Sequence, residues 1–273
     1  MDQLKLEDIN PHPRDKNITF TEKGLEVGLE KDHIYTIKDV KEIPVSTTET
    51  IGKYHEHFNA DKILDKMFPN GVEIYNGKNE SYIGKTREEI KFDWEQAGPL
   101  GTAMHQDIEN FFNGDPVENP DCKEHQMFLS FWGDYLEKNP THRPYRTEWL
   151  IYDDSPNCKK VLAGSIDFVV VDENGDLYIF DWKRAREIKK ENRYESKSGL
   201  TICKKMFKQF NDLDDCNYNH YRLQLNFYRH VLETLYDKKV KSMTLIILHP
   251  NQEKYEPHNL EKYDLSEIWH TLR

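Results

Sequence analysis

The sequence lacks long apolar runs and closely spaced cysteines. No stretch approaches the roughly 20 consecutive apolar residues that a membrane-spanning helix needs, and residues 1–16 lack the apolar centre of a signal peptide. We therefore expect a soluble, intracellular protein, whose compartment the sequence does not define. A disulfide framework or a structural zinc site is not expected either, because no Cys-x-x-Cys pair occurs. The four cysteines are Cys122, Cys158, Cys203 and Cys216.

The sequence also has fewer basic than acidic residues: 38 Lys and Arg and 49 Asp and Glu give a net charge of −11. This balance argues against a protein that coats nucleic acid through a general basic surface. It allows an enzyme that binds phosphate through a local patch and a bound cation. Residues 183–208 form a candidate patch, because they contain ten Lys or Arg and only three Glu.

The first half of the chain favours helices after an irregular start. Apolar residues make up 37% of the sequence, enough for one large α/β domain or one domain with a smaller lobe. Residues 1–45 are typical of a polar arm with short extended pieces. Ser46 and Glu49 form a capping-box pattern, which predicts a helix running toward Met67. The other expected helices are 85–112, with an interruption at Gly98-Pro99, and 122–138.

The second half has the composition of strands around one buried helix. Residues 184–217 lack periodicity, which favours a loop or an irregular helical excursion. The expected strands are 145–152, 160–171, 176–183 and 241–249, and the expected helices are 219–236 and 265–272. This order predicts an α/β fold in which helices flank both faces of a mixed β-sheet. We expect an N-terminal arm and helical extension at 1–80 and the core at 81–273.

The hairpin between the second and third of these strands brings two acids together if its register follows the turn. With a three-residue loop at 173–175, Asp172 pairs with Asp176, and Asp167 then lies opposite Asp181. A two-residue loop would send these two acids to different faces. Carboxylates that share a face can hold a hard cation of the kind that assists phosphodiester hydrolysis.

Lys183 lies two residues beyond Asp181, so on a strand it points to the same side. An ammonium there could orient a water molecule or stabilise charge that develops on a phosphate. An Asp-x-Lys on a surface strand is usually a solvated ion pair. This one ends the apolar strand 177–181, where buried acids beside a lysine are costly unless they bind something. We therefore interpret Asp167, Asp181 and Lys183 as catalytic residues.

Four motifs in this order resemble the PD-(D/E)XK nuclease superfamily, in its RecB-like exonuclease branch. Similar nucleases occur in mitochondria, phages and large DNA viruses, so a phage or virus origin is one expectation. The resemblance implies a restriction-endonuclease-like fold, and the Asp before x-Lys, in place of the commoner Glu, is normal for this branch. The motifs are Gly101-Thr-Ala-Met-His105 with Glu109, Gly164-Ser-Ile-Asp167, Asp181-Trp-Lys183 and Gln224-Leu-Asn-Phe-Tyr228.

The resemblance also implies what the motif residues do. A metal ion, Mg²⁺ or Mn²⁺, would be bound by His105, Asp167, Asp181 and the backbone carbonyl of Trp182. Lys183 would be the catalytic lysine. Some nucleases of this type carry an iron–sulfur cluster on four cysteines. That cluster is not expected here, because its ligands are normally closely spaced.

Other assignments keep an alternative. The resemblance implies that Gln224 and Tyr228 support the site and contact nucleic acid, but they could be a packed core pair. Glu109 shares a helix face with His105, and the two could be an exposed polar pair. Glu148, on the strand before the hairpin, could be a further ligand, a partner for the lysine or a surface charge.

The leading hypothesis is a metal-dependent DNA nuclease, an exonuclease that acts on ends or single strands. An RNA endonuclease of the cap-snatching kind uses a similar site, and the Gln-x-x-x-Tyr helix favours DNA over it. A nonenzymatic nucleic-acid binding module on a nuclease fold is the third reading, against which the intact Asp, Asp and Lys set argues. Lys189, Lys190 and Arg193 would clamp the substrate or belong to a solvated loop.

Overall fold

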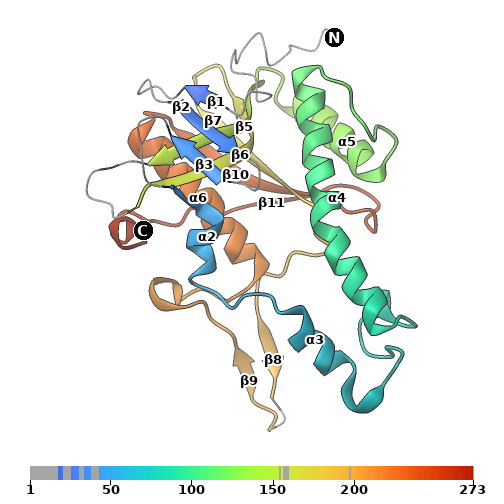
Figure 1. The fold of residues 1–273 in the computed structure, drawn as a ribbon. Coiled ribbons are helices and arrows are strands. Elements are labelled where there is room, and N and C mark those ends of the chain that lie inside the picture. The colour runs from blue at the N-terminus through green and yellow to red at the C-terminus, as the bar shows by residue number, and fades with distance from the viewer. Residues whose placement is uncertain are drawn as a thin grey trace.

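A mixed six-stranded sheet runs through the centre of the computed structural model (Figure 1). Its order is β11-β10-β7-β6-β4, with β5 paired to the other edge of β6. The strands are β4 (Val45–Ser46), β5 (Arg143–Asp153), β6 (Leu162–Val171), β7 (Leu177–Lys183), β10 (Val240–Ile247) and β11 (Glu256–Asn259). The structure describes residues 18–20, 26–30, 34–37, 43–153, 155, 160–196 and 198–272. Most of the polar arm, Cys158 and Lys197 lie outside these residues.

The two faces of the sheet are covered by different helices, because apolar side chains alternate along β6 and β7. Phe168 and Trp182 pack with α4 (Arg87–Asn113) and α5 (Lys123–Lys138) in one apolar cluster. Val169 and Ile179 pack with α6 (Asn217–Leu235) in the other. The expected helix at 122–138, the expected strands and the mixed sheet between helices are confirmed. Among the described residues, no helix combines the length and apolar composition needed to cross a bilayer.

The sheet opens where β6 changes partners. On one edge, β6 pairs with β5 over its whole length. On the other edge it pairs with β7 over 168–171 and with β4 over 162–163. Residues 164–167 lie in the fork between these two partners. On this edge residues 164–167 pair with neither β7 nor β4, so their backbone groups are available to other parts of the fold and a site can form there.

The N-terminal half differs from the sequence prediction in two places. The single helix expected from Ser46 toward Met67 is two helices, α2 (Thr47–Gly52) and α3 (Ala60–Met67), because Asn59 caps a new helix by accepting from Lys62 N. Ser46 does cap α2 through Glu49 N, at 2.9 Å. α4 is continuous through Pro99, where an interruption was expected. Most residues of this stretch are exposed, so water can hydrate the carbonyl that proline leaves without a donor.

Two expectations for the second half are wrong. Residues 184–217 contain a small antiparallel hairpin, β8 (Arg193–Glu195) and β9 (Thr201–Cys203), which projects from the body beside α3 (Figure 1). The helix expected at 265–272 is only a 3-10 turn, η6 (Trp269–Thr271), where Trp269 Nε1 donates to buried Asp153. The remaining short elements are β1 (Ile18–Phe20), β2 (Glu26–Glu30), β3 (Ile34–Ile37), η3 (Pro69–Gly71), η4 (Glu80–Tyr82) and η5 (Lys208–Phe210).

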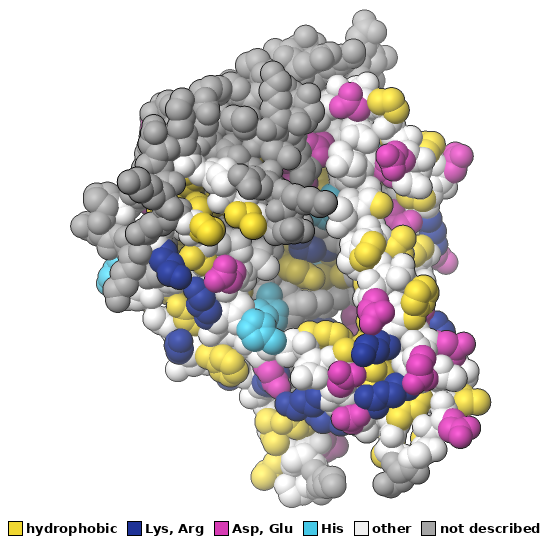
Figure 2. Space-filling view, in the orientation of Figure 1, with side chains coloured by type: hydrophobic (Ala, Val, Ile, Leu, Met, Phe, Trp, Pro, Cys, Tyr) yellow, Lys and Arg dark blue, Asp and Glu magenta, His cyan; other side chains and the backbone are white. Residues whose placement is uncertain are grey.

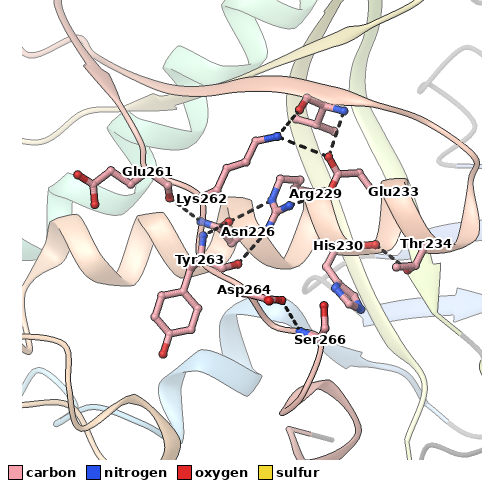
Figure 3. Close-up of polar contacts among 11 residues, drawn as sticks. Asn226, Arg229, His230, Glu233, Thr234, Glu261, Lys262, Tyr263, Asp264 and Ser266 are labelled. Atoms are coloured by element: carbon pink, nitrogen blue, oxygen red, sulfur yellow. Dashed lines mark hydrogen bonds and ion pairs between the residues drawn. The ribbon is translucent and has the colours of Figure 1, made fainter.

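The C-terminal segment around residues 261–266 is hydrogen bonded to the side of α6 that faces away from the sheet (Figure 3). Asn226 is fully buried; its Oδ1 accepts from Tyr263 N at 2.8 Å and its Nδ2 donates to Glu261 O at 3.1 Å. Arg229 donates to Tyr263 O at 2.8 Å and to Glu233 at 2.7 Å. Residues 224 and 228 lie on the opposite side of the helix, so this segment holds α6 with that side turned to the fork.

Candidate active site

The hairpin register places Asp167 and Asp181 on the same face of the sheet. Asp172 N donates to Asp176 O at 3.1 Å, Gly175 has φ 83°, and Phe168 pairs with Phe180. This register confirms the predicted three-residue loop, and continuing it by one residue sets Asp167 opposite Asp181. Asp167 Oδ2 accepts from Trp182 N at 2.9 Å. This contact crosses the fork at the point where the β6–β7 ladder ends.

His105 reaches the same place from α4. Its Nε2 lies 2.9 Å from the carbonyl oxygen of Trp182. Its Nδ1 lies 3.5 Å from Asp167 Oδ2 and 3.7 Å from Glu148 Oε1. Glu148 has φ 45°, a backbone conformation that is strained for this residue, and its carboxylate accepts from Ser165 Oγ at 2.7 Å. One ligand atom each of His105, Glu148 and Asp167 lies within 4.8 Å of the other two.

Asp181 and Lys183 form a buried ion pair beside this group. Lys183 Nζ lies 2.6 Å from Asp181 Oδ2, and the Asp181 side chain is 2% exposed. Lys183 pairs with Oδ2, whereas Oδ1 has no hydrogen-bond donor among the described residues. A buried carboxylate oxygen without a donor costs free energy, and a bound cation would complete it. The donor chemistry therefore fits a hard divalent ion next to the lysine.

Burial and neighbouring charges oppose each other at these groups. Burial raises the pKa of Asp167 to about 7, with a further contribution from the nearby carboxylate of Asp181. Burial lowers the pKa of His105, but Asp167 and Glu148 outweigh it and raise the value to about 9. For Lys183, burial also favours the neutral form, and the carboxylates of Asp181 and Asp167 raise its pKa above the ordinary value. Such opposed shifts are typical of functional sites.

α6 closes the site with three residues on one side of the helix. Gln224 Nε2 donates to Tyr228 Oη at 3.0 Å, and both side chains reach the site. Tyr221 is a residue that sequence reasoning missed: its ring centroid lies 5.1 Å from Lys183 Nζ. Its position three residues before Gln224, on the same helix side, was the available signal.

These side chains line a cavity of about 410 Å³. In Figure 2 the surface is hollowed beside α4. The cavity walls include Thr48, His105, Glu148, Ser165, Asp167, Trp182, Lys183, Arg184, Tyr221, Gln224 and Tyr228. Glu109 does not line this cavity; it is buried and receives a hydrogen bond from Gln106 at 3.3 Å.

The three residues expected to clamp substrate do not line this cavity. Lys189 pairs with Glu187 at 2.8 Å and lines a neighbouring cavity of about 760 Å³. Arg193 on β8 pairs with Glu191 at 3.1 Å. Lys190 lies over the ring of Tyr218, 5.3 Å from its centroid. Tyr221 lines both cavities, so the two are adjacent.

Comparison with known proteins identifies the family of this chain. A sequence model described as "PD-(D/E)XK nuclease superfamily" matches residues 121–271. The match covers more than half of the sequence, and the chain belongs to this superfamily. No curated protein matches the chain. Among solved structures, the chain is similar to "Crystal structure of SSO0001", with 13% identity and a TM-score of 0.35, over 86% of this chain and 76% of that chain.

Membership of this superfamily implies metal-dependent nuclease activity and a nucleic-acid substrate. Members use divalent metal ions, and the cluster of His105, Glu148 and Asp167 offers ligands for one. His105 lies outside the matched residues 121–271, so its place in the site comes from the geometry of α4 and the fork.

Proposed function

We propose that this protein is a divalent-metal-dependent deoxyribonuclease of the RecB-like branch, an exonuclease that acts on DNA ends or single strands. One observation carries the proposal. His105, Glu148 and Asp167 converge on one side of the cavity, while the buried pair of Asp181 and Lys183 lies beside them. A ligand group next to a lysine is the arrangement that phosphodiester hydrolysis needs.

The metal would be held by His105, Asp167, Asp181 and the carbonyl of Trp182, with Glu148 as a further ligand. The position of His105 supports the proposal, because its Nδ1 faces the carboxylates of Asp167 and Glu148 at 3.5 and 3.7 Å while its Nε2 hydrogen bonds with that carbonyl oxygen at 2.9 Å. When bound, Mg²⁺ or Mn²⁺ would polarise the scissile phosphate and help a water molecule to lose a proton.

The protein's own groups would then orient the substrate. Lys183, kept cationic by the two aspartates, would stabilise the charge that develops on the phosphate oxygens. The ring of Tyr221 would hold the ammonium of Lys183 in place through a cation–π contact. Gln224 and Tyr228 would contact the nucleic-acid strand at the cavity wall. The side chains of Lys189, Lys190 and Arg193 would attract the backbone phosphates of the strand leaving the site.

A digest of matched substrates tests the proposal. End-labelled linear and circular DNA, single- and double-stranded, and RNA of the same sequence are incubated with Mg²⁺ and then with Mn²⁺. We expect linear DNA to be shortened from its ends, circular single strands to survive, and the Lys183→Met protein to be inactive. Cleavage of circular strands at the rate of linear ones would contradict the exonuclease, and preferential cleavage of RNA would contradict the deoxyribonuclease.

A further inference from the structure

A second group of metal-ligating side chains lies outside the active site. His55 comes from the connection between α2 and α3, Asp215 lies just before α6, and His220 lies in the first turn of α6. One potential ligand atom of each lies within 4.8 Å of the other two. Segments far apart in the sequence therefore present two imidazoles and a carboxylate at one point, beside the cavity of about 760 Å³.

The carboxylate of Asp215 divides its two oxygens between different partners. Oδ2 lies 3.1 Å from Lys204 Nζ, and the same ammonium lies 2.7 Å from Glu56. Oδ1 faces the histidines, at 2.8 Å from His220 Nε2. The side chain of Asp215 is 4% exposed, so the protein sets its direction. One oxygen is thus fixed by a lysine that is itself neutralised, and the other is aimed at the imidazoles.

The two imidazoles lie face to face. Their centroids are 3.9 Å apart and their planes differ by 19°. Parallel rings cannot both direct a nitrogen at one ion. One ring must therefore rotate, and the cavity that both rings line provides the space.

We propose that His55, Asp215 and His220 bind one divalent ion of the zinc class, with a fourth position open to the cavity. Two imidazoles and a carboxylate are a donor set that suits zinc better than magnesium. Ligand atoms on a tetrahedral zinc lie about 3.3 Å apart, given bonds of roughly 2.0–2.1 Å. The ligand atoms of this cluster lie within 4.8 Å of one another. The cysteine spacing that argued against zinc does not bear on a histidine site.

Binding at this point would join two parts of the fold. The connection that carries His55 would be cross-linked to α6, the helix that carries Tyr221, Gln224 and Tyr228. A metal that binds the folded chain more tightly than the unfolded one raises its stability. The ion would therefore hold α6 from its N-terminal end, while the C-terminal segment holds the middle of the helix.

Cobalt spectroscopy tests the site independently of nuclease activity. The full chain, freed of metal with a chelator, is titrated with Co²⁺, whose visible absorption reports a site of four or five ligands. We expect a visible band from one Co²⁺ bound at this cluster, in addition to any Co²⁺ held in the active site; Zn²⁺ should displace it, and the thermal midpoint should rise with Zn²⁺ in the His105→Ala protein as well. His55→Ala and His220→Ala should each weaken binding by at least about tenfold, the loss seen even for residues that only support a ligand.

Two variants serve as matched controls. His57 lines the same cavity without belonging to the cluster, and His105 belongs to the active site. His57→Ala and His105→Ala should both retain the visible band. The proposal is overturned if no band forms, if the band survives in both cluster variants, or if only a control variant removes it. Circular dichroism checks folding, and His220→Gln replaces His220→Ala if the latter does not fold. Because no activity is read, the result leaves the proposed function untouched.

Discussion

The ring of Tyr228 on α6 packs directly against the backbone of Gly164 on β6. A Cβ at position 164 would lie 2.5 Å from Tyr228 Cε1, closer than nonbonded atoms approach, and 3.0 Å from Thr47 Oγ1, a tight contact. The fork of the sheet and the helix that closes the site therefore touch through a glycine. Without a side chain at this position, α6 comes near enough to place Gln224 and Tyr228 in the cavity.

Replacing this glycine should displace the helix. We expect Gly164→Ala to lower the free energy of unfolding by about 1–3 kcal/mol, as overpacking of a core does, and to reduce nuclease activity. Urea unfolding and a DNA digest measure the two effects. Gly133→Ala on α5 is the control, because a Cβ there meets nothing within 4 Å; it should not lower stability. A Gly164→Ala protein as stable and active as the wild type would refute the contact.

The pair of Asp181 and Lys183 allows catalysis to be separated from stability. Asp181→Asn and Lys183→Met should each reduce turnover by on the order of a hundredfold or more. Each also leaves a buried charge with fewer partners, which costs up to about 3–5 kcal/mol. The double variant removes both charges, so it should regain stability relative to Asp181→Asn and remain inactive. Lys241→Met, which breaks an ion pair with Asp176 at the other end of β7, is the control. Near wild-type turnover in a folded Asp181→Asn protein would rule out its role.

Metal dependence should report on His105. Imidazole is a poor ligand for magnesium and a better one for manganese. We expect activity with both ions, a lower concentration of manganese at half-maximal rate, and complete loss with a chelator. In His105→Ala the advantage of manganese should shrink, whereas Glu148→Gln should raise the requirement for both ions. Unchanged metal titrations of His105→Ala would mean that the histidine is not a ligand.

The basic residues after β7 should make binding depend on salt. Lys189, Lys190 and Arg193 are neutralised together, and single-stranded DNA affinity is measured at several salt concentrations with calcium replacing magnesium. Fewer phosphate contacts release fewer counterions, so we expect weaker binding and a shallower salt slope. The thermal midpoint should hardly change, because Lys189 and Arg193 are more than half exposed. Lys239→Gln with Lys241→Gln, near Asp176, is the control pair. A slope equal to that of the wild type would place the binding track elsewhere.

Local sequence patterns predicted the parts of the site that lie on one hairpin. The turn at 173–175 determines the β6–β7 register, and the period of two along each strand then sets which face carries Asp167, Asp181 and Lys183. The helical motif around His105 could be recognised, but its distance to the strands could not. Propensity also failed for 184–217 and 265–272, where short elements are stabilised by contacts with other segments.

By itself, the sequence determined the mixed sheet between helices and the placing of Asp167, Asp181 and Lys183 on one face of the β6–β7 hairpin, because both follow from local periodicity and turn chemistry. Only the tertiary structure decided which side chains from distant segments meet those residues. Glu148 enters the site through a strained backbone on β5, and Tyr221 lies over Lys183 because α6 approaches the sheet at Gly164. The packing of the elements also leaves Glu109, Lys189, Lys190 and Arg193 outside the active-site cavity. Such contacts depend on how whole elements pack, and no local pattern encodes that packing.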